Sequence, residues 1–165
     1  LRAEHFDAGI PVIALNEAIH AVEELGLSNP VYALQQDAKL RATCCPKNVP
    51  ILVSTKAANY YAHYEDAYII PTVEVDLNPN ALSVSAAIRI ARRLGAQSFR
   101  LVCFDACVNK KTTYAKRIGY ESTWGGEPRR FFSHRTKIIH HTQKAPVKWI
   151  IPEALAVEAS GKSPQ

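Results

Sequence analysis

The stretch ALSVSAAIRIARRLGAQSFRLVCFD, residues 81–105, decides the fold class. Its first half predicts a helix that begins at Ser83 or Ser85 and ends at Gly95. Four apolar residues recur there at helical spacing, with arginines mostly opposite: Ala87, Ile88, Ala91 and Leu94. The apolar run Phe99–Phe104 then predicts a buried central strand, within which Cys103 is expected to be a small core residue.

Working outward from this stretch, short apolar runs bounded by turn residues predict further strands. They lie at Ile10–Leu15, Val31–Leu34, Pro50–Val53, Tyr68–Ile70 and Val147–Ile151. Helical patterns alternate with them at Glu17–Leu25, from Ser54 or Thr55 through Tyr64, and at Arg130–His141. This alternation predicts an α/β, Rossmann-like parallel sheet with helices on both faces. The strands near residues 10–15, 31–34, 51–53 and 99–104 are expected to share that sheet.

Length and composition limit the classes of protein that remain. A chain of 165 residues suits one nucleotide-binding-like domain, expected over residues 1–160, with a disordered tail at 161–165. No apolar run approaches the roughly 20 residues of a membrane helix. Four cysteines without C-x-x-C spacing favour a reduced, cytoplasmic protein.

The charge is moderately basic, with 20 Lys+Arg against 15 Asp+Glu and a formal net charge of +5. Part of the excess lies in residues 110–137. Such a cluster suits an anionic partner, which includes a nucleotide, a sugar phosphate, a nucleic acid or an acidic membrane surface. A solvated basic face is the alternative interpretation.

Ligands of parallel α/β sheets bind beyond the carboxyl ends of the strands. This rule selects Asn16, Gln35 to Asp37, Ser83, and Asp105 with the loop after it, which follow predicted strands or begin a predicted helix. Within residues 35–37, Gln36 is the candidate ligand residue. Asn16 and Ser83 have a second interpretation as ordinary helix N-caps.

Residues 81–105 resemble a segment of the bacterial lipooligosaccharide sialyltransferases, and also the related domain of hydroxymethylpterin diphosphokinase-like proteins. In the sialyltransferases a serine loop opens a helix ending in Leu-Gly, and an apolar strand ending in an Asp follows. The resemblance continues through short, degenerate matches at Ala14–Asn16, Asp105, Asn109, Tyr114, His134 and the strand VKWIIP at 147–152.

The resemblance implies a glycosyltransferase that takes a CMP- or UDP-linked sugar, uses no metal, and has an acceptor that is a glycan or a nucleic acid. His134 would be the general base and Tyr114 a phosphate ligand. At its strand end, Asn16 suits a hydrogen bond to a ribose or base, and the helix N-terminus at Ser83 favours an anion. Asp105 suits organising the loop that follows it. Gln36 and Asn109 are further candidate nucleotide-binding residues. The tyrosine and histidine residues of 60–64 form an acceptor surface or, more simply, part of the core.

Two departures leave rival functions open. No Gly-Asn-Gly-Pro-Ser-like phosphate loop precedes Ile10, and the sequence has no Met, so the first βα unit is expected to lie outside the given sequence or to be lost. Cys103 stands where the family usually has a Gly. One rival is a Mg-ATP diphosphokinase with Asp37, Asp76 and Asp105 near the ion, and another is a non-catalytic nucleotide-binding or structural module. A zinc site of Cys44, Cys45, His63 and Cys107 has no recognisable spacing.

Overall fold

The computed structural model describes residues 1–36, 48–55, 57–70, 82–103 and 128–150, with side chains from His134 onward in the last range. Two compact units divide the chain, Leu1–Gly95 and Ala96–Gln165, and each is described by itself. The expectation of a single domain over residues 1–160 stays a prediction.

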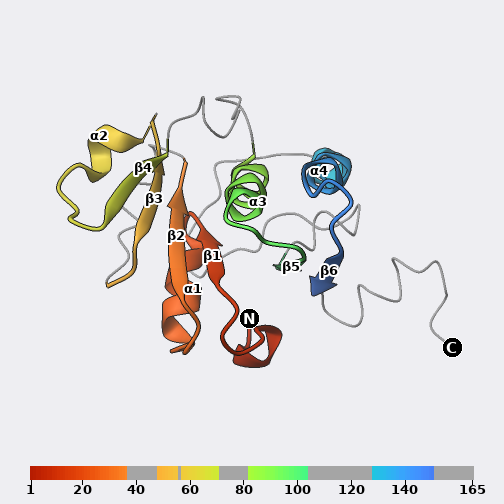
Figure 1. Cartoon of the computed structure of the whole chain (residues 1–165), viewed down its shortest axis with the longest axis horizontal. Coiled ribbons are helices and arrows are strands. Elements are labelled where there is room, and N and C mark those ends of the chain that lie inside the picture. Colours follow the sequence, from red (N-terminus) through yellow and green to blue (C-terminus); the bar gives the residue numbers. More distant parts are fainter. Residues whose placement is uncertain (37–47, 56, 71–81, 104–127, 151–165) are drawn as a thin grey trace, which may run out of the picture. The chain divides into compact units, whose positions relative to one another are not determined.

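Within the described residues of the first unit there are four strands, three helices and a 3-10 turn. Figure 1 labels the strands and the three helices. In chain order these are η1 (Ala3–His5), β1 (Val12–Leu15), α1 (Ala18–Glu24), β2 (Val31–Gln35), β3 (Ile51–Ser54), α2 (Ala58–Tyr61), β4 (Ala67–Ile70) and α3 (Ser83–Arg93). The strands form one sheet in the order β1-β2-β3-β4, and every neighbouring pair is parallel. The predicted α/β parallel sheet is confirmed.

Helices cover both faces of this sheet, because side chains alternate between the faces along each strand. On one face, Ile19 and Val22 of α1 pack against Ala14 and Ala33, and α2 packs against β3 through the fully buried Tyr61. On the other face, α3 packs against Leu34 of β2 through three residues: Ala86, Ala87 and Ile90.

The glycines predicted to end helices do so, whereas the polar residues predicted to cap helices do not. Gly26 follows α1 with a φ of 57° and Gly95 follows α3 with a φ of 94°, in the left-handed region that glycine adopts without strain. The expected helix through Tyr64 is the short α2, which no side chain caps. Leu94, expected on the buried face of α3, is 80% exposed because the helix ends at Arg93 and the chain turns away.

The second unit contains β5 (Phe99–Val102), α4 (Pro128–His141) and β6 (Val147–Ile150). β5 and β6 pair in parallel as a separate two-stranded sheet, so the expectation that β5 shares a sheet with β1–β3 is wrong. An apolar run indicates that a strand is buried but carries no information about its partner. Cys103 also differs from expectation: it follows β5 at a φ of 62° and is exposed.

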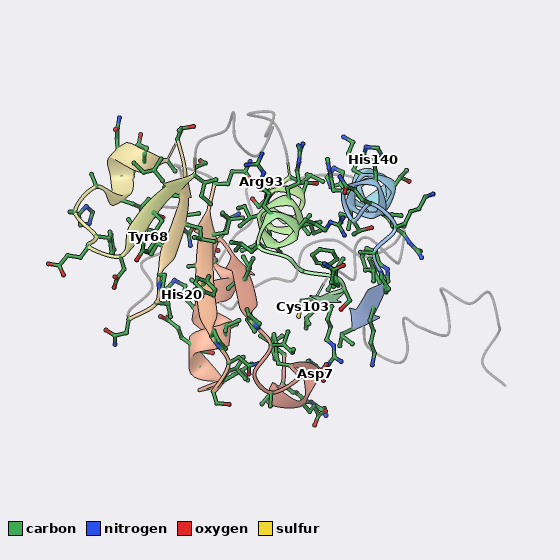
Figure 2. All side chains as sticks on the ribbon, viewed as in Figure 1. Asp7, His20, Tyr68, Arg93, Cys103 and His140 are labelled. Atoms are coloured by element: carbon green, nitrogen blue, oxygen red, sulfur yellow. The ribbon has the colours of Figure 1, made fainter. Side chains whose placement is uncertain are left out.

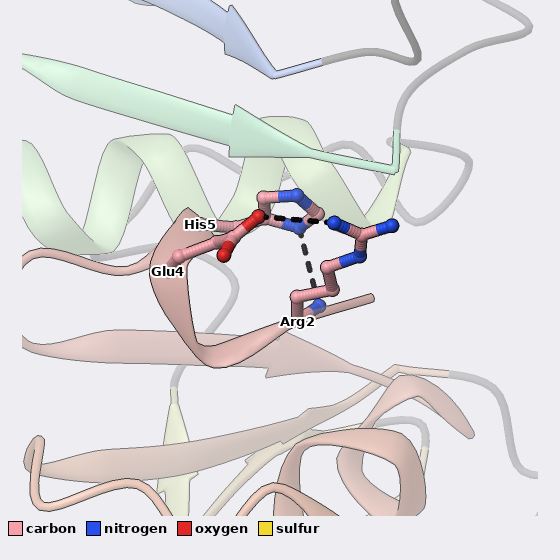
Figure 3. Close-up of polar contacts among 3 residues, drawn as sticks. All are labelled: Arg2, Glu4 and His5. Carbon is pink, nitrogen blue, oxygen red and sulfur yellow. Dashed lines mark hydrogen bonds and ion pairs between the residues drawn. The ribbon is translucent and has the colours of Figure 1, made fainter.

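Local contacts organise the segment before β1. The backbone N–H of Arg2 donates to His5 Nδ1 at 3.3 Å, and its guanidinium lies 3.3 Å from Glu4 Oε1 (Figure 3). Asn29 Nδ2 donates to the carbonyl oxygens of Asp7 at 2.6 Å and Ile10 at 2.9 Å, which fastens this segment to the turn before β2. The expectation of a missing first βα unit stays a prediction.

The longest helix of the described residues is α4, with 14 residues. None of the described helices has the length and apolar character needed to cross a membrane.

Candidate functional site at the carboxyl edge of the first sheet

The carboxyl edge of the four-stranded sheet, where its parallel strands end, gathers a group of polar side chains. Asn16 follows β1, Gln35 ends β2 with Gln36 after it, and Ser54 ends β3. The hydroxyl of Ser83, at the first residue of α3, joins them. We call these five residues the edge cluster: Asn16, Gln35, Gln36, Ser54 and Ser83.

Asn16 is the centre of the edge cluster. Its Nδ2 donates to Ser83 Oγ at 3.4 Å, and its Oδ1 accepts from the Gln36 backbone N–H at 3.5 Å. Its backbone carbonyl accepts from Gln35 Nε2 at 3.3 Å. Since α3 covers one face of the sheet and Gln35 alternates with Leu34 onto the other, Asn16 connects groups from both faces.

Asn16 adopts this role because of its backbone conformation. Its φ of 50° lies in the left-handed region, which Asn tolerates better than most residues. Its N–H continues the ladder by donating to the Leu34 carbonyl at 3.0 Å, and the chain then turns sharply into α1. The helix N-cap is Glu17, without a side-chain cap bond, so the interpretation of Asn16 as an ordinary cap is wrong.

Ser83 also differs from the cap that its sequence position predicts. It is the first residue within α3, whose N-cap is Leu82, and among the described residues no side chain makes a capping hydrogen bond to that helix. The first turn of α3 carries no acidic residue. The positive end of an 11-residue helix therefore lies beside the Asn16 amide and the Ser83 hydroxyl, an arrangement that favours an anionic group.

The three hydrogen bonds that link Asn16 to Ser83, Gln35 and Gln36 are long compared with the usual 2.7–3.2 Å of N–H···O bonds. Long bonds are weak, so a ligand can replace them at little cost in free energy. The side chain of Gln35 is 0% exposed, and its Oε1 accepts no hydrogen bond from any described residue. The edge cluster thus holds a buried polar atom whose full complement of partners is missing within the described part.

Sequence reasoning predicted four members of the edge cluster and missed one. Asn16, Gln36 and Ser83 were predicted, and hydrogen bonds link them. Gln35, which ends β2 directly before Gln36, was selected by the same rule, and its Nε2 donates to the Asn16 carbonyl. Ser54 was expected to cap a helix, but its Oγ donates to the Gln36 carbonyl at 3.2 Å instead. Its position at the end of a predicted strand is the signal that could have found it.

The other predicted site residues are not part of this cluster as described. Asp105, Asn109 and Tyr114 lie outside the described residues, as do Asp37 and Asp76 of the magnesium alternative. His134 lies on α4 in the second unit and is half-buried. Its assignment as a base therefore remains a prediction from sequence.

Most ligands of the alternative zinc site also lie outside the described residues. Cys44, Cys45 and Cys107 lie outside the described residues. His63 is exposed, and its ring lies 4.5 Å from that of Tyr64. Among the residues that the structure describes, no three His, Cys, Asp or Glu side chains gather as metal ligands would.

We compared the chain with protein families, curated proteins and solved structures. No protein-family model, no curated protein and no solved structure matches this chain.

Proposed function

We propose that this chain is a glycosyltransferase-like domain that binds the nucleotide of a CMP- or UDP-linked sugar at the edge cluster and transfers the sugar without a metal ion. The observation that carries the proposal is the 3.4 Å hydrogen bond between Asn16 Nδ2 and Ser83 Oγ. It joins a strand end to a helix N-terminus, the two features at which parallel α/β sheets hold nucleotides.

The edge cluster offers the donors that a nucleotide requires. The N-terminus of α3 and the Ser83 hydroxyl suit a phosphate oxygen. The amides of Asn16 and Gln35 suit a ribose hydroxyl or the polar edge of a base, because an amide both donates and accepts. In the proposed complex, the ligand replaces the long hydrogen bonds of Asn16.

The transfer itself follows from the chemistry of a nucleotide sugar. An acceptor hydroxyl of a glycan or nucleic acid attacks the anomeric carbon, the bond from that carbon to the phosphate oxygen breaks, and the hydroxyl proton passes to a base. His134 is the proposed base, on the strength of the sequence resemblance. The negative charge left on the phosphate is stabilised by the N–H groups of α3, with Tyr114 as the proposed further donor. The distribution of cysteines favours a cytoplasmic setting for this reaction.

Thermal unfolding with added nucleotides tests the binding step. CMP or UDP is expected to stabilise the full chain, by about 2.7 kcal/mol at a concentration 100 times the Kd. Ser83→Ala should weaken this stabilisation because it removes the hydroxyl at the proposed phosphate. Ser28→Ala is the matched control, since Ser28 is exposed and lies before β2, away from the carboxyl edge.

The outcomes separate the rival functions. Stabilisation by ATP with Mg²⁺ alone would replace the proposal with the diphosphokinase function. No stabilisation by any of these nucleotides would leave a non-catalytic module. Equal loss of stabilisation in the Ser83 and Ser28 variants would remove the edge cluster from the binding site.

A transfer assay with the nucleotide sugar identified in this way tests the base. His134→Ala should abolish transfer and leave nucleotide affinity nearly unchanged, because a general base acts in the transition state. His20→Ala is the control, since His20 is a half-buried histidine of α1 outside both the edge cluster and α4. Unchanged turnover in the His134 variant would remove this residue from the mechanism.

A further inference from the structure

Charge is distributed unevenly between the two units. Residues 1–95 carry 8 Lys+Arg against 10 Asp+Glu, a formal net charge of −2. Residues 96–165 carry 12 against 5, a formal net charge of +7, and the two values give the +5 of the chain. Such asymmetry between the halves of a chain is typical of a protein whose basic half meets a polyanion.

The described part of the second unit is more basic still. Residues 96–103 and 128–150 contain seven Lys+Arg and no Asp or Glu. All three lysines among them are exposed: Lys137 on α4, Lys144 in the turn after it, and Lys148 on β6. Within this described part, therefore, no carboxylate is present to neutralise them.

α4 presents Lys137 on its outer side, and Lys144 follows the helix. Its inner side contains Ile138 and Thr142 just after it, which are 0% and 1% exposed. Lys137 and His140 are exposed and lie three residues apart, so they share one face of the helix. His140 is labelled on α4 in Figure 2. Thr136 and Gln143 are also exposed and add uncharged hydrogen-bond donors.

We propose that this basic face, defined by Lys137, His140, Lys144 and Lys148, binds a nucleic acid through its phosphodiester backbone. The lysines extend from the middle of α4 across the following turn to β6, so they suit a ligand that carries repeated negative charges. A single phosphate would engage only one or two of them. This proposal concerns the second unit alone and does not rest on the nucleotide-sugar proposal.

The packing of α4 favours a nucleic acid over an acidic membrane. A helix that lies on a membrane needs an exposed apolar face, which enters the lipid. The apolar side of α4 is buried at Ile138, and Ile139, at 46%, is the only large apolar residue that is strongly exposed in the described part of this unit. Exposed lysines, Thr136 and Gln143 instead match the donors that contact phosphate and sugar oxygens.

Such binding is independent of base sequence and depends strongly on salt. Each phosphate that a cation neutralises releases counterions, which contributes about −0.7 to the slope of log affinity against log salt for single strands and about −0.9 for duplexes. Three lysine contacts therefore contribute roughly −2 to −3 to this slope.

Fluorescence anisotropy with labelled oligonucleotides of mixed sequence, single-stranded and duplex, tests the proposal on the full chain between 50 and 200 mM NaCl. Binding is expected to weaken steeply as salt rises. The double variant Lys137→Gln/Lys144→Gln should reduce affinity at 50 mM NaCl by about tenfold or more and make the salt slope shallower by about 1.5. All substituted side chains are exposed, and circular dichroism checks that each variant is folded.

Arg2→Gln/Arg93→Gln is the matched control, because it removes the same charge from exposed positions of the first unit. It should leave affinity and slope nearly unchanged. The proposal is overturned if neither oligonucleotide binds, or if both double variants weaken binding equally. It is also overturned if the chain binds vesicles containing phosphatidylserine but no oligonucleotide, since the basic face would then serve a membrane.

Discussion

Asn16 shows how one residue sets the geometry of the edge cluster. The left-handed φ of 50° lets the chain leave β1 while the side chain reaches Ser83 Oγ and the Gln36 N–H. Asn is one of few residues that combine tolerance of this conformation with both a donor and an acceptor. The backbone and the side chain of Asn16 therefore make separate contributions, and substitution can distinguish them.

Asn16→Gly and Asn16→Ala remove the same hydrogen bonds but differ in backbone freedom. Gly adopts a positive φ without strain, whereas Ala is strained there by about 1 kcal/mol. Both variants should be less stable than the wild-type chain, and Asn16→Ala should be less stable than Asn16→Gly by roughly that amount. Urea unfolding at equilibrium measures the difference. Equal stability of the two variants would show that φ at residue 16 is not left-handed.

Cys103 also has a positive φ, and this bears on the absence of a glycine at that position. It stands where the resembled family usually has a Gly, and its φ is 62°. The backbone conformation that Gly would adopt easily is therefore present here with a Cys side chain, which is exposed rather than in the core. Cysteine is among the residues most often buried, so its residue type predicted a core position. β5 ends at Val102, so Cys103 lies after the strand.

At the scale of elements, periodicity predicted α3 and its buried face well, but not the end of that face. Ala87 and Ile88 are buried as expected, and Ile90 packs against Leu34 as part of the same core. Leu94 continues the helical spacing but is 80% exposed, because the helix ends before it. Spacing describes a regular helix and carries no information about where the chain turns away.

Two substitutions in α3 test this contrast directly. Ile90→Ala should lower the free energy of unfolding by about 2–4 kcal/mol, because it removes buried methyl groups and leaves a cavity beside Leu34. Leu94→Ala is the matched control and should change it by less than about 0.5 kcal/mol at an exposed position. Urea unfolding of both variants measures the effect. A large loss of stability in the Leu94 variant would restore the face expected from the sequence.

The strands illustrate what the sequence can and cannot predict of a sheet. Alternating elements predicted a parallel sheet with helices on both faces, and β1–β4 with α1, α2 and α3 confirm it. Partner choice was wrong for β5, which pairs with β6. Pairing depends on long-range contacts, whereas the apolar character of a run depends only on its burial.

For the candidate site too, the sequence predicted the residues but not all of their contacts. The rule that ligands bind at carboxyl edges selected Asn16, Gln36 and Ser83, and these residues are linked by hydrogen bonds. Helix-cap preferences gave Asn16, Ser83 and Ser54 other roles, because a cap is judged from the few residues around it. Their actual partners come from elements up to 67 residues away in sequence, which no local rule includes.

At the scale of the whole molecule, the main feature is the separation of charge, −2 in residues 1–95 and +7 in residues 96–165. Like charges in one compact unit repel each other in the folded state more than in the expanded unfolded chain. The exposed Lys144 and Lys148 lie in the part of the second unit where no described residue is acidic. Their repulsion should therefore lower stability most when salt is scarce.

Added salt should stabilise the chain for this reason. The Debye length falls from about 30 Å at 0.01 M to about 10 Å at 0.1 M ionic strength, so repulsion between exposed charges is largely screened. We expect the free energy of unfolding to rise by roughly 0.5 kcal/mol or more between 10 and 150 mM NaCl. Lys144→Gln/Lys148→Gln should reduce this rise, whereas Arg2→Gln/Arg93→Gln, which makes the acidic unit more negative, should not. If both double variants respond to salt as the wild-type chain does, repulsion within the basic unit does not limit its stability, and the lysines face charges that balance them.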